Sequence, residues 1–287
     1  MPPIRPHYVF KSPTWKVFFP LFLTKPQRQC NDIEFFNLLQ EIRIGQLSEK
    51  SKNMINVKVN NSKFIRTFYE TTHVVGLRET ADKINTLLCN NIPFDHTCNN
   101  PIFSTSIDTL DFKPVDNHNL KNFQFLTNLP KTLYIQEGVR MMFLNNKLFN
   151  HGICNRTIGI VTKIIDNENV EVTFPTTTSI TKIIVQKATA YFEYNGMHIS
   201  RQQFPLQKVF TLTVHKTQGL TLPHVTVSID ENIFAEGQVY VAMSRTTSWN
   251  TIDILSFDFN QIKVPTAALQ EYNRLMQIHS AGLQSLR

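Results

Sequence analysis

The sequence is poor in glycine and has no long apolar run. Only nine of the 287 residues are glycine, none of them is followed by lysine, and the first is Gly45. A phosphate-binding loop of the form GxxxxGKS/T is therefore absent from this sequence. No segment approaches the ~20 consecutive apolar residues of a membrane span. The longest early run, residues 17–23, is broken by Pro20, and no signal-peptide pattern precedes it.

Cysteine is also scarce. The four cysteines form no CxxC pair, and His96 and Cys98 lack the second ligand pair that a zinc site needs. We therefore expect reduced thiols, no metal site, no membrane contact and a protein of the cell interior.

The remaining composition is that of an ordinary globular protein, with 41% apolar and 18% charged residues. Lysine and arginine number 29 against 22 acidic residues, a net charge of +7. Such a surplus suits a polyanionic partner. The basic residues are spread along the chain, so charge alone gives only modest support for nucleic-acid binding.

Apolar spacing predicts alternating strands and helices over much of the chain. A helix is expected after Asp32, ending at Gly45, since Phe35, Leu38, Leu39 and Ile42 form one stripe. Further strands and helices alternate in the order that is typical of a three-layer α/β domain. They are strands at 73–77, 210–214, 225–229 and 252–255, and helices at 84–88, 236–244 and from 265 onward.

Residues 132–194 have a different character. Short runs alternate β-branched and polar residues, as at 159–165 and 169–174, with turn signals such as Asp166-Asn167 between them. This pattern predicts a small antiparallel module of four to six strands. We therefore expect an α/β domain in two parts, 1–130 and 201–287, interrupted by an inserted β-barrel at 131–200.

Two motifs near the C-terminal end carry the chemistry. Residues 213–219 read Thr-Val-His-Lys-Thr-Gln-Gly, a strand that runs into a polar loop able to offer donors to a phosphate backbone. The simpler reading is a solvated loop. Residues 240–245 read Tyr-Val-Ala-Met-Ser-Arg, an apolar helix that ends in a permanently charged guanidinium suited to phosphate. The simpler reading there is a snorkelling surface arginine.

Together with Gln238, with Phe204-Pro205-Leu206 upstream and with residues 23–29, these blocks resemble the last motifs of superfamily 1 helicases. The resemblance is to the petite-integration-frequency DNA helicase family and its Helitron relatives, and it covers nearly the whole chain. It implies the second RecA-like domain of a P-loop NTPase, a three-layer α/β/α fold, with an inserted SH3-like β-barrel. Gly152, Asn155, Thr157 and Gly159 echo the barrel pattern, although Arg156 and Ile158 depart from it.

The resemblance also assigns roles to residues. It makes Arg245 and Arg28 catalytic, as arginines that face the γ-phosphate. The nucleotide-binding residues that it implies are Gln29, Gln218, Gly219 and Gln238. The single-stranded DNA contacts that it implies are His215, Lys216, Thr217 and Thr221. The chain departs from the family at Met243, where leucine is usual, and at Gln27, where an aromatic residue is usual.

For the intact enzyme the resemblance implies ATP-driven 5′-to-3′ translocation and unwinding, in DNA repair, recombination or telomere maintenance. ATP and Mg2+ would bind only with the missing N-terminal RecA-like domain in cis, so we expect no hydrolysis by this chain alone. The expected state is a monomer in the nucleus, with the mitochondrion as second choice. The alternatives are a truncated paralogue or transposon remnant that at most binds single-stranded DNA, and a β-barrel interaction module.

Overall fold

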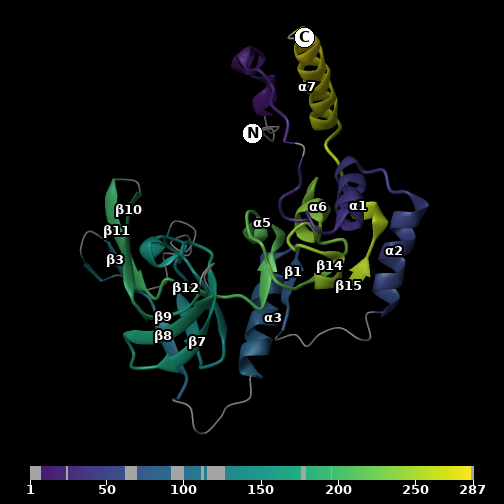
Figure 1. Ribbon diagram of the computed structural model, residues 1–287. Coiled ribbons are helices and arrows are strands. Elements are labelled where there is room, and N and C mark those ends of the chain that lie inside the picture. Colours follow the sequence, from purple (N-terminus) through teal and green to yellow (C-terminus); the bar gives the residue numbers. More distant parts are fainter. Residues whose placement is uncertain are drawn as a thin grey trace. The chain divides into compact units, whose positions relative to one another are not determined.

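The computed structural model describes residues 8–23, 25–61, 70–91, 100–110, 113–114, 127–175, 179–194 and 196–285 (Figure 1). The chain divides into two compact units. Unit 1 consists of Met1–Ile65 and Val214–Arg287, and unit 2 of Arg66–Thr213. Within the described residues, no helix combines the length and the apolar character that crossing a bilayer requires. His96 and Cys98 lie outside the described residues.

Unit 1 is mainly helical, with one pair of parallel strands. Strands β14 (Val225–Ile229) and β15 (Ile252–Phe257) pair in parallel. Its helices are α1 (Ile33–Ile44), α2 (Glu49–Asn60), α5 (Val214–Thr217), α6 (Gln238–Met243) and α7 (Thr266–Ser285). Its 3-10 turns are η1 (Val9–Lys11), η2 (Pro13–Val17), η5 (Trp249–Thr251) and η6 (Phe259–Gln261).

Helix α1 has the boundaries and the buried face that its sequence predicts. The Asp32 carboxylate accepts a hydrogen bond from the Phe35 amide at 2.9 Å, which satisfies a donor in the first turn. Gly45 ends the helix at φ 74°, a left-handed conformation that glycine adopts without strain. The four buried side chains are the predicted stripe, Phe35, Leu38, Leu39 and Ile42.

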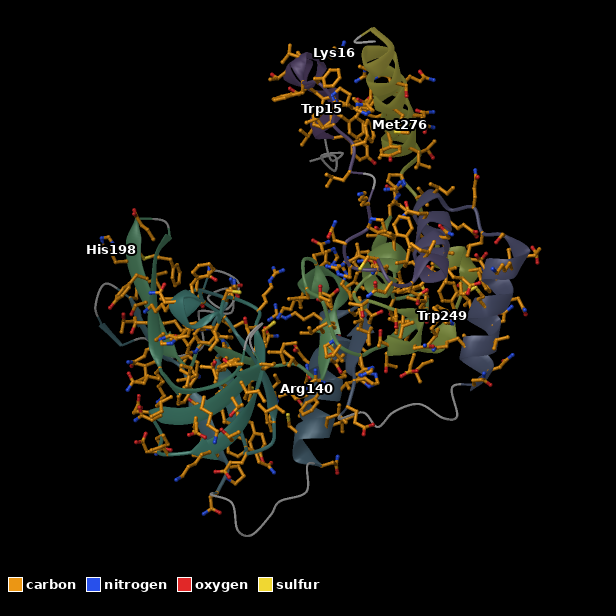
Figure 2. All side chains as sticks on the ribbon, in the orientation of Figure 1. Trp15, Lys16, Arg140, His198, Trp249 and Met276 are labelled. Carbon is orange, nitrogen blue, oxygen red and sulfur yellow. The ribbon has the colours of Figure 1, made fainter. Side chains whose placement is uncertain are left out.

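The first described residues contact the last helix. The Trp15 indole Nε1 donates to Glu271 Oε1 on α7 at 2.8 Å, and the rings of Phe22 and Tyr272 meet edge to face. Figure 2 shows Trp15 beside α7, which also carries Met276. Residues far apart in the sequence thus form one part of unit 1.

Unit 2 contains a strand–helix–strand arrangement with a polar link. Strands β1 (Thr72–Val75) and β13 (Thr211–Thr213) pair in parallel, and α3 (Arg78–Asn90) follows β1. The buried Asn85 side chain donates to the Thr211 carbonyl at 2.8 Å and accepts from the Thr211 amide at 2.9 Å. One amide therefore satisfies both backbone groups of a buried strand residue.

The rest of unit 2 is mainly antiparallel sheet. The strands are β2 (Ile102–Thr105), β3 (Ile107–Leu110), β4 (Lys113–Pro114), β5 (Thr132–Ile135), β6 (Arg140–Phe143), β7 (Ile158–Ile164), β8 (Asn169–Pro175), β9 (Ile180–Gln186), β10 (Ala188–Tyr194), β11 (Met197–Gln203) and β12 (Leu206–Lys208), with η4 at Phe149–His151. One sheet has the order β12-β6-β7-β8-β9, a second has the order β10-β11-β3-β4, and β2 pairs with β5. Buried side chains alternate along β7 and β8, so one face of the first sheet forms a core that includes Val161, Val172 and Phe174.

The expected α/β fold and antiparallel module are present, but the SH3-like barrel is not confirmed. Among the described residues no closed barrel is seen, because β9 and β12 end the five-stranded sheet as edges. Pairing of β3 with β11 and of β2 with β5 also draws residues 102–110 into the same unit as these sheets. A buried ion pair at 2.7 Å, Arg201 with Asp108, fastens β11 to β3. The insert boundaries near 130 and 200 remain a prediction.

Candidate functional site

Arg245 lies two residues after the end of α6, and neutral oxygens accept its hydrogen bonds. Its Nε donates to the Val241 carbonyl at 2.7 Å, its Nη1 to the Thr217 carbonyl at 3.2 Å, and its Nη2 to Ser244 Oγ at 2.6 Å. The residue is 8% exposed. The guanidinium is therefore fixed in one orientation at the end of the helix, as a snorkelling surface arginine would not be.

Arg28 reaches the same place from the turn before α1. Its Nε donates to Thr221 Oγ1 at 3.0 Å and its Nη1 donates to the Ser244 carbonyl at 2.7 Å. Both arginines thus contact Ser244, although 217 positions separate them in the sequence (245 − 28). All of these residues belong to unit 1.

The electrostatics of this pair favour an anion. Burial, with a smaller contribution from the charge of Arg28, lowers the pKa of Arg245 from 12.5 to about 10, while Tyr240 opposes the shift. In the described part of the chain, the hydrogen-bond partners of both guanidiniums are neutral oxygens. Two neighbouring guanidinium cations repel each other, so a bound phosphate would stabilise the pair.

Two predicted glutamines, Gln29 and Gln238, are buried. Gln29, 7% exposed, donates from Nε2 to the carbonyls of Ser244 at 3.4 Å and Thr246 at 2.6 Å. Gln238 accepts from the Ala235 amide at 3.1 Å through Oε1. Its buried Nε2 has no hydrogen-bond partner within the described residues. A buried donor of this kind is stabilised by an added acceptor oxygen, such as one from a phosphate.

The polar loop predicted after β13 is instead the short helix α5 followed by a turn, and its residues divide into exposed and buried members. His215, Gln218, Gly219 and Thr221 are exposed, and Lys216 is half-buried. Thr217 is fully buried, with its hydroxyl donating to the Val214 carbonyl at 2.7 Å. The Thr217 side chain is thus occupied inside the protein, while its carbonyl holds Arg245.

Gly219 has a conformational reason for its place in this loop. Its φ is 80°, and an added Cβ would meet nothing within 4 Å. Glycine is therefore favoured here because the turn requires a left-handed backbone conformation, and not because a side chain would lack room. The exposed loop members can present donors and acceptors to a nucleic-acid backbone at this turn.

The structure brings all ten predicted site residues into unit 1 and adds others that the sequence reasoning missed. Ser244 was quoted within a motif but given no role, and it accepts from both arginines and Gln29. Asp32, predicted only as a helix cap, also accepts from the Trp249 amide at 2.8 Å. No cluster of three His, Cys, Asp or Glu side chains that could hold a metal occurs in the described ranges.

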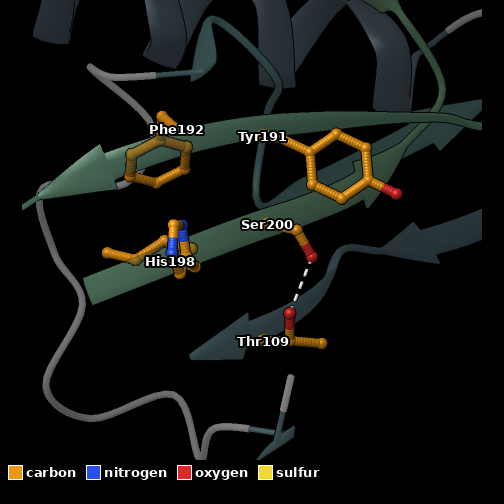
Figure 3. Close-up of a pocket in the computed structure, with 6 residues that line it drawn as sticks. Thr109, Tyr191, Phe192, His198 and Ser200 are labelled. Carbon is orange, nitrogen blue, oxygen red and sulfur yellow. Dashed lines mark hydrogen bonds between the residues drawn. The ribbon is translucent and has the colours of Figure 1, made fainter. Parts of the chain in front are cut away.

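Unit 2 has a separate shallow cavity of about 240 Å³ on its second sheet (Figure 3). Its lining includes Tyr191, His198 and the hydroxyls of Thr109 and Ser200, which lie 2.7 Å apart. No residue predicted from the sequence as a site residue lies there. The arginine cluster of unit 1 is therefore the candidate site.

Comparison with known proteins finds similarity to helicases. Residues 117–252 match the family model of the viral superfamily 1 RNA helicase core domain. The ATP-dependent DNA helicase PIF1 of Homo sapiens is 26% identical over 99% of this chain and 43% of the relative. The Pif1 helicase of Campylobacter jejuni is 26% identical over 93% of this chain and 63% of the relative. The findings therefore support a superfamily 1 helicase domain of the Pif1 type.

Solved structures give the same fold. The crystal structure of Pif1 helicase from Candida albicans aligns with a TM-score of 0.76 and 24% identity, covering 93% of this chain and 64% of that one. Pif1 from Bacteroides, solved with ADP-AlF3 and single-stranded DNA, aligns with a TM-score of 0.66 and 23% identity, covering 89% and 56%. The chain spans less than half of the human relative and under two thirds of these structures.

Proposed function

We propose that this chain is the arginine-supplying, DNA-contacting portion of an ATP-dependent 5′-to-3′ DNA helicase. One observation carries the proposal: Arg28 and Arg245 converge on Ser244, and within the described residues their hydrogen-bond partners are neutral oxygens. Such a pair neutralises charge that develops on a transferred phosphoryl group. The similarity to ATP-dependent DNA helicases supports this reading.

The nucleotide would be ATP with Mg2+, in a cleft shared with a RecA-like domain that supplies the phosphate-binding loop. Arg28 and Arg245 would meet the terminal phosphate, and the free Nε2 of Gln238 would donate to a phosphate oxygen. Mg2+ would neutralise the β- and γ-oxygens when bound. Gln218 and Gly219 would lie toward the nucleotide. The expected state is a monomer in the nucleus.

Single-stranded DNA would bind at helix α5 and the turn that follows it. The exposed His215 and Thr221 and the half-buried Lys216 are suited to phosphate contacts. Because the Thr217 carbonyl holds Arg245, movement of this segment on DNA binding would act directly on the arginine. A relative from Bacteroides was solved with both ADP-AlF3 and single-stranded DNA, which supports the pairing of these two ligands.

A non-catalytic role is the second candidate. The exposed loop residues alone would allow a truncated paralogue to bind single-stranded DNA without hydrolysing ATP. In that case DNA affinity would be present, but joining the chain to a RecA-like domain with a phosphate-binding loop would yield no DNA-stimulated hydrolysis.

The test is ATP hydrolysis by that joined assembly, with and without single-stranded DNA. We expect DNA-stimulated turnover that falls by roughly 10³ or more in Arg245→Ala, the usual effect of losing an arginine finger. Arg156→Ala, remote in sequence and in unit 2, is the matched control and should keep wild-type turnover. Equal rates for Arg245→Ala and wild type would refute the proposal.

A further inference from the structure

The side-chain amide of Gln29 links the two segments that carry the arginines. Its Nε2 donates to the carbonyls of Ser244 and Thr246, at 3.4 Å and 2.6 Å. These carbonyls lie immediately before and after Arg245 in the chain, and Gln29 itself follows Arg28. An amide NH2 group has two hydrogens, so this bridge leaves Gln29 no donor for a nucleotide.

The bridge is part of a wider attachment between the same two segments. Arg28 donates to the Ser244 carbonyl at 2.7 Å, and Asp32 accepts from the Trp249 amide at 2.8 Å. Together with the two bonds of Gln29, four hydrogen bonds join residues 28–32 to residues 244–249. Gln29 is the member of this set that holds the backbone on both sides of Arg245.

We propose that Gln29 is a positioning residue, which sets the separation and orientation of Arg28 and Arg245 without touching the nucleotide. This inference rests on the proposed function, in which both guanidiniums meet one terminal phosphate. Charge stabilisation of a transition state depends on donors that are already in place, and a displacement of ~1 Å can lower a rate by about 10². Loss of the Gln29 bridge therefore lowers turnover rather than nucleotide affinity.

Unit 2 offers a matched control. Gln203 is fully buried, and its Nε2 also donates to two carbonyls, those of Ser104 at 3.1 Å and Lys131 at 3.5 Å. Gln203→Met removes the same kind of bridge far from the arginines in the sequence. It therefore separates a general effect of losing a buried amide from an effect on Arg28 and Arg245.

The geometric test uses the chain itself. Hydrogen exchange at the arginine Nε–H groups is measured by NMR in wild type, Gln29→Met and Gln203→Met. We expect exchange at Arg245 and Arg28 to rise by roughly tenfold or more in Gln29→Met, through local opening, and to stay unchanged in Gln203→Met. Gln29→Glu, which keeps the shape but cannot donate, should behave like Gln29→Met. Unchanged exchange in both Gln29 variants would overturn the proposal.

The functional test uses the assembly that hydrolyses ATP. Gln29→Met should lower kcat by about 10- to 100-fold while KM for ATP stays within about twofold. If Arg245→Ala and Arg28→Ala both keep wild-type kcat, the proposed function itself fails. If those variants lose activity while Gln29→Met keeps wild-type kcat, the function stands and the positioning role fails.

Discussion

At the scale of single residues, the central feature is a pair of guanidiniums in a partly dehydrated place. Burial is the main cause that lowers the pKa of Arg245 to about 10, and the side chain remains charged at neutral pH. A lysine at this position could not donate to three separate oxygens in the planar fork that Arg245 uses. The residue type is thus required by geometry as well as by charge.

The buried histidine His73 gives a prediction of how stability depends on pH. His73 on β1 is 3% exposed, and burial, with a smaller effect from the Arg140 charge, lowers its pKa from 6.5 to about 4. The unfolded chain binds a proton near pH 6.5 and the folded chain only near pH 4. Stability from the neutral histidine is therefore present above pH 6.5 and is lost as pH falls toward 4.

The measurement is urea unfolding at pH 7.5 and pH 5. The free energy of unfolding of wild type should fall from pH 7.5 to pH 5. In His73→Gln we expect this fall to be smaller, by on the order of 2 kcal/mol. His198→Gln, a change at an exposed histidine on β11, should keep the wild-type dependence. Identical pH dependence in wild type and His73→Gln would contradict the assignment.

At the scale of elements, local signals predicted helices better than the arrangement of strands. Helix α1 was predicted because apolar spacing, the Asp32 cap and Gly45 all act within one segment. Strands β2, β3 and β4 were missed because residues 100–114 show no regular alternation, and β3 is paired with β11, about 90 residues later. A closed barrel was expected from a short motif that resembles the barrel pattern. Such a motif does not determine whether the first and last strands of a sheet pair with each other.

The first sheet of unit 2 gives a stability prediction. An added Cβ on Gly159 would lie 2.6 Å from the Phe174 ring and 2.7 Å from the Thr173 carbonyl oxygen. Phe174 is fully buried and the carbonyl belongs to the paired strand, so neither moves easily. Gly159→Ala should therefore lower the free energy of unfolding by ~1–3 kcal/mol through overpacking.

The control is Gly138→Ala, measured by the same chemical unfolding. Nothing lies within 4 Å of a Cβ there, and only the φ of 87° opposes a side chain. It should cost about 1–2 kcal/mol from backbone strain alone. A Gly159→Ala protein as stable as wild type would show that β7 and β8 are less tightly packed than described.

At the scale of the whole molecule, the two ends of the chain make unit 1 and the middle makes unit 2. The ends are joined around Trp249, whose carbonyl accepts from Lys58 at 3.0 Å and whose ring meets Phe35 (Figure 2). The candidate residues His215 to Gly219 and Arg245 could be named from the sequence, because each lies within one short motif. It could not predict the Gln29 bridge, since that bridge uses backbone carbonyls 215 and 217 positions away.

The most direct measurement is strand separation on a duplex with a 5′ single-stranded tail, by the chain joined to a RecA-like domain with a phosphate-binding loop. We predict ATP-dependent unwinding by wild type and none by Arg245→Ala. The affinity for single-stranded DNA should be the same in both, because the arginine acts on the terminal phosphate of the nucleotide and not on the DNA. Unwinding by Arg245→Ala at the wild-type rate, or DNA binding without unwinding by wild type, would contradict a helicase function for this chain.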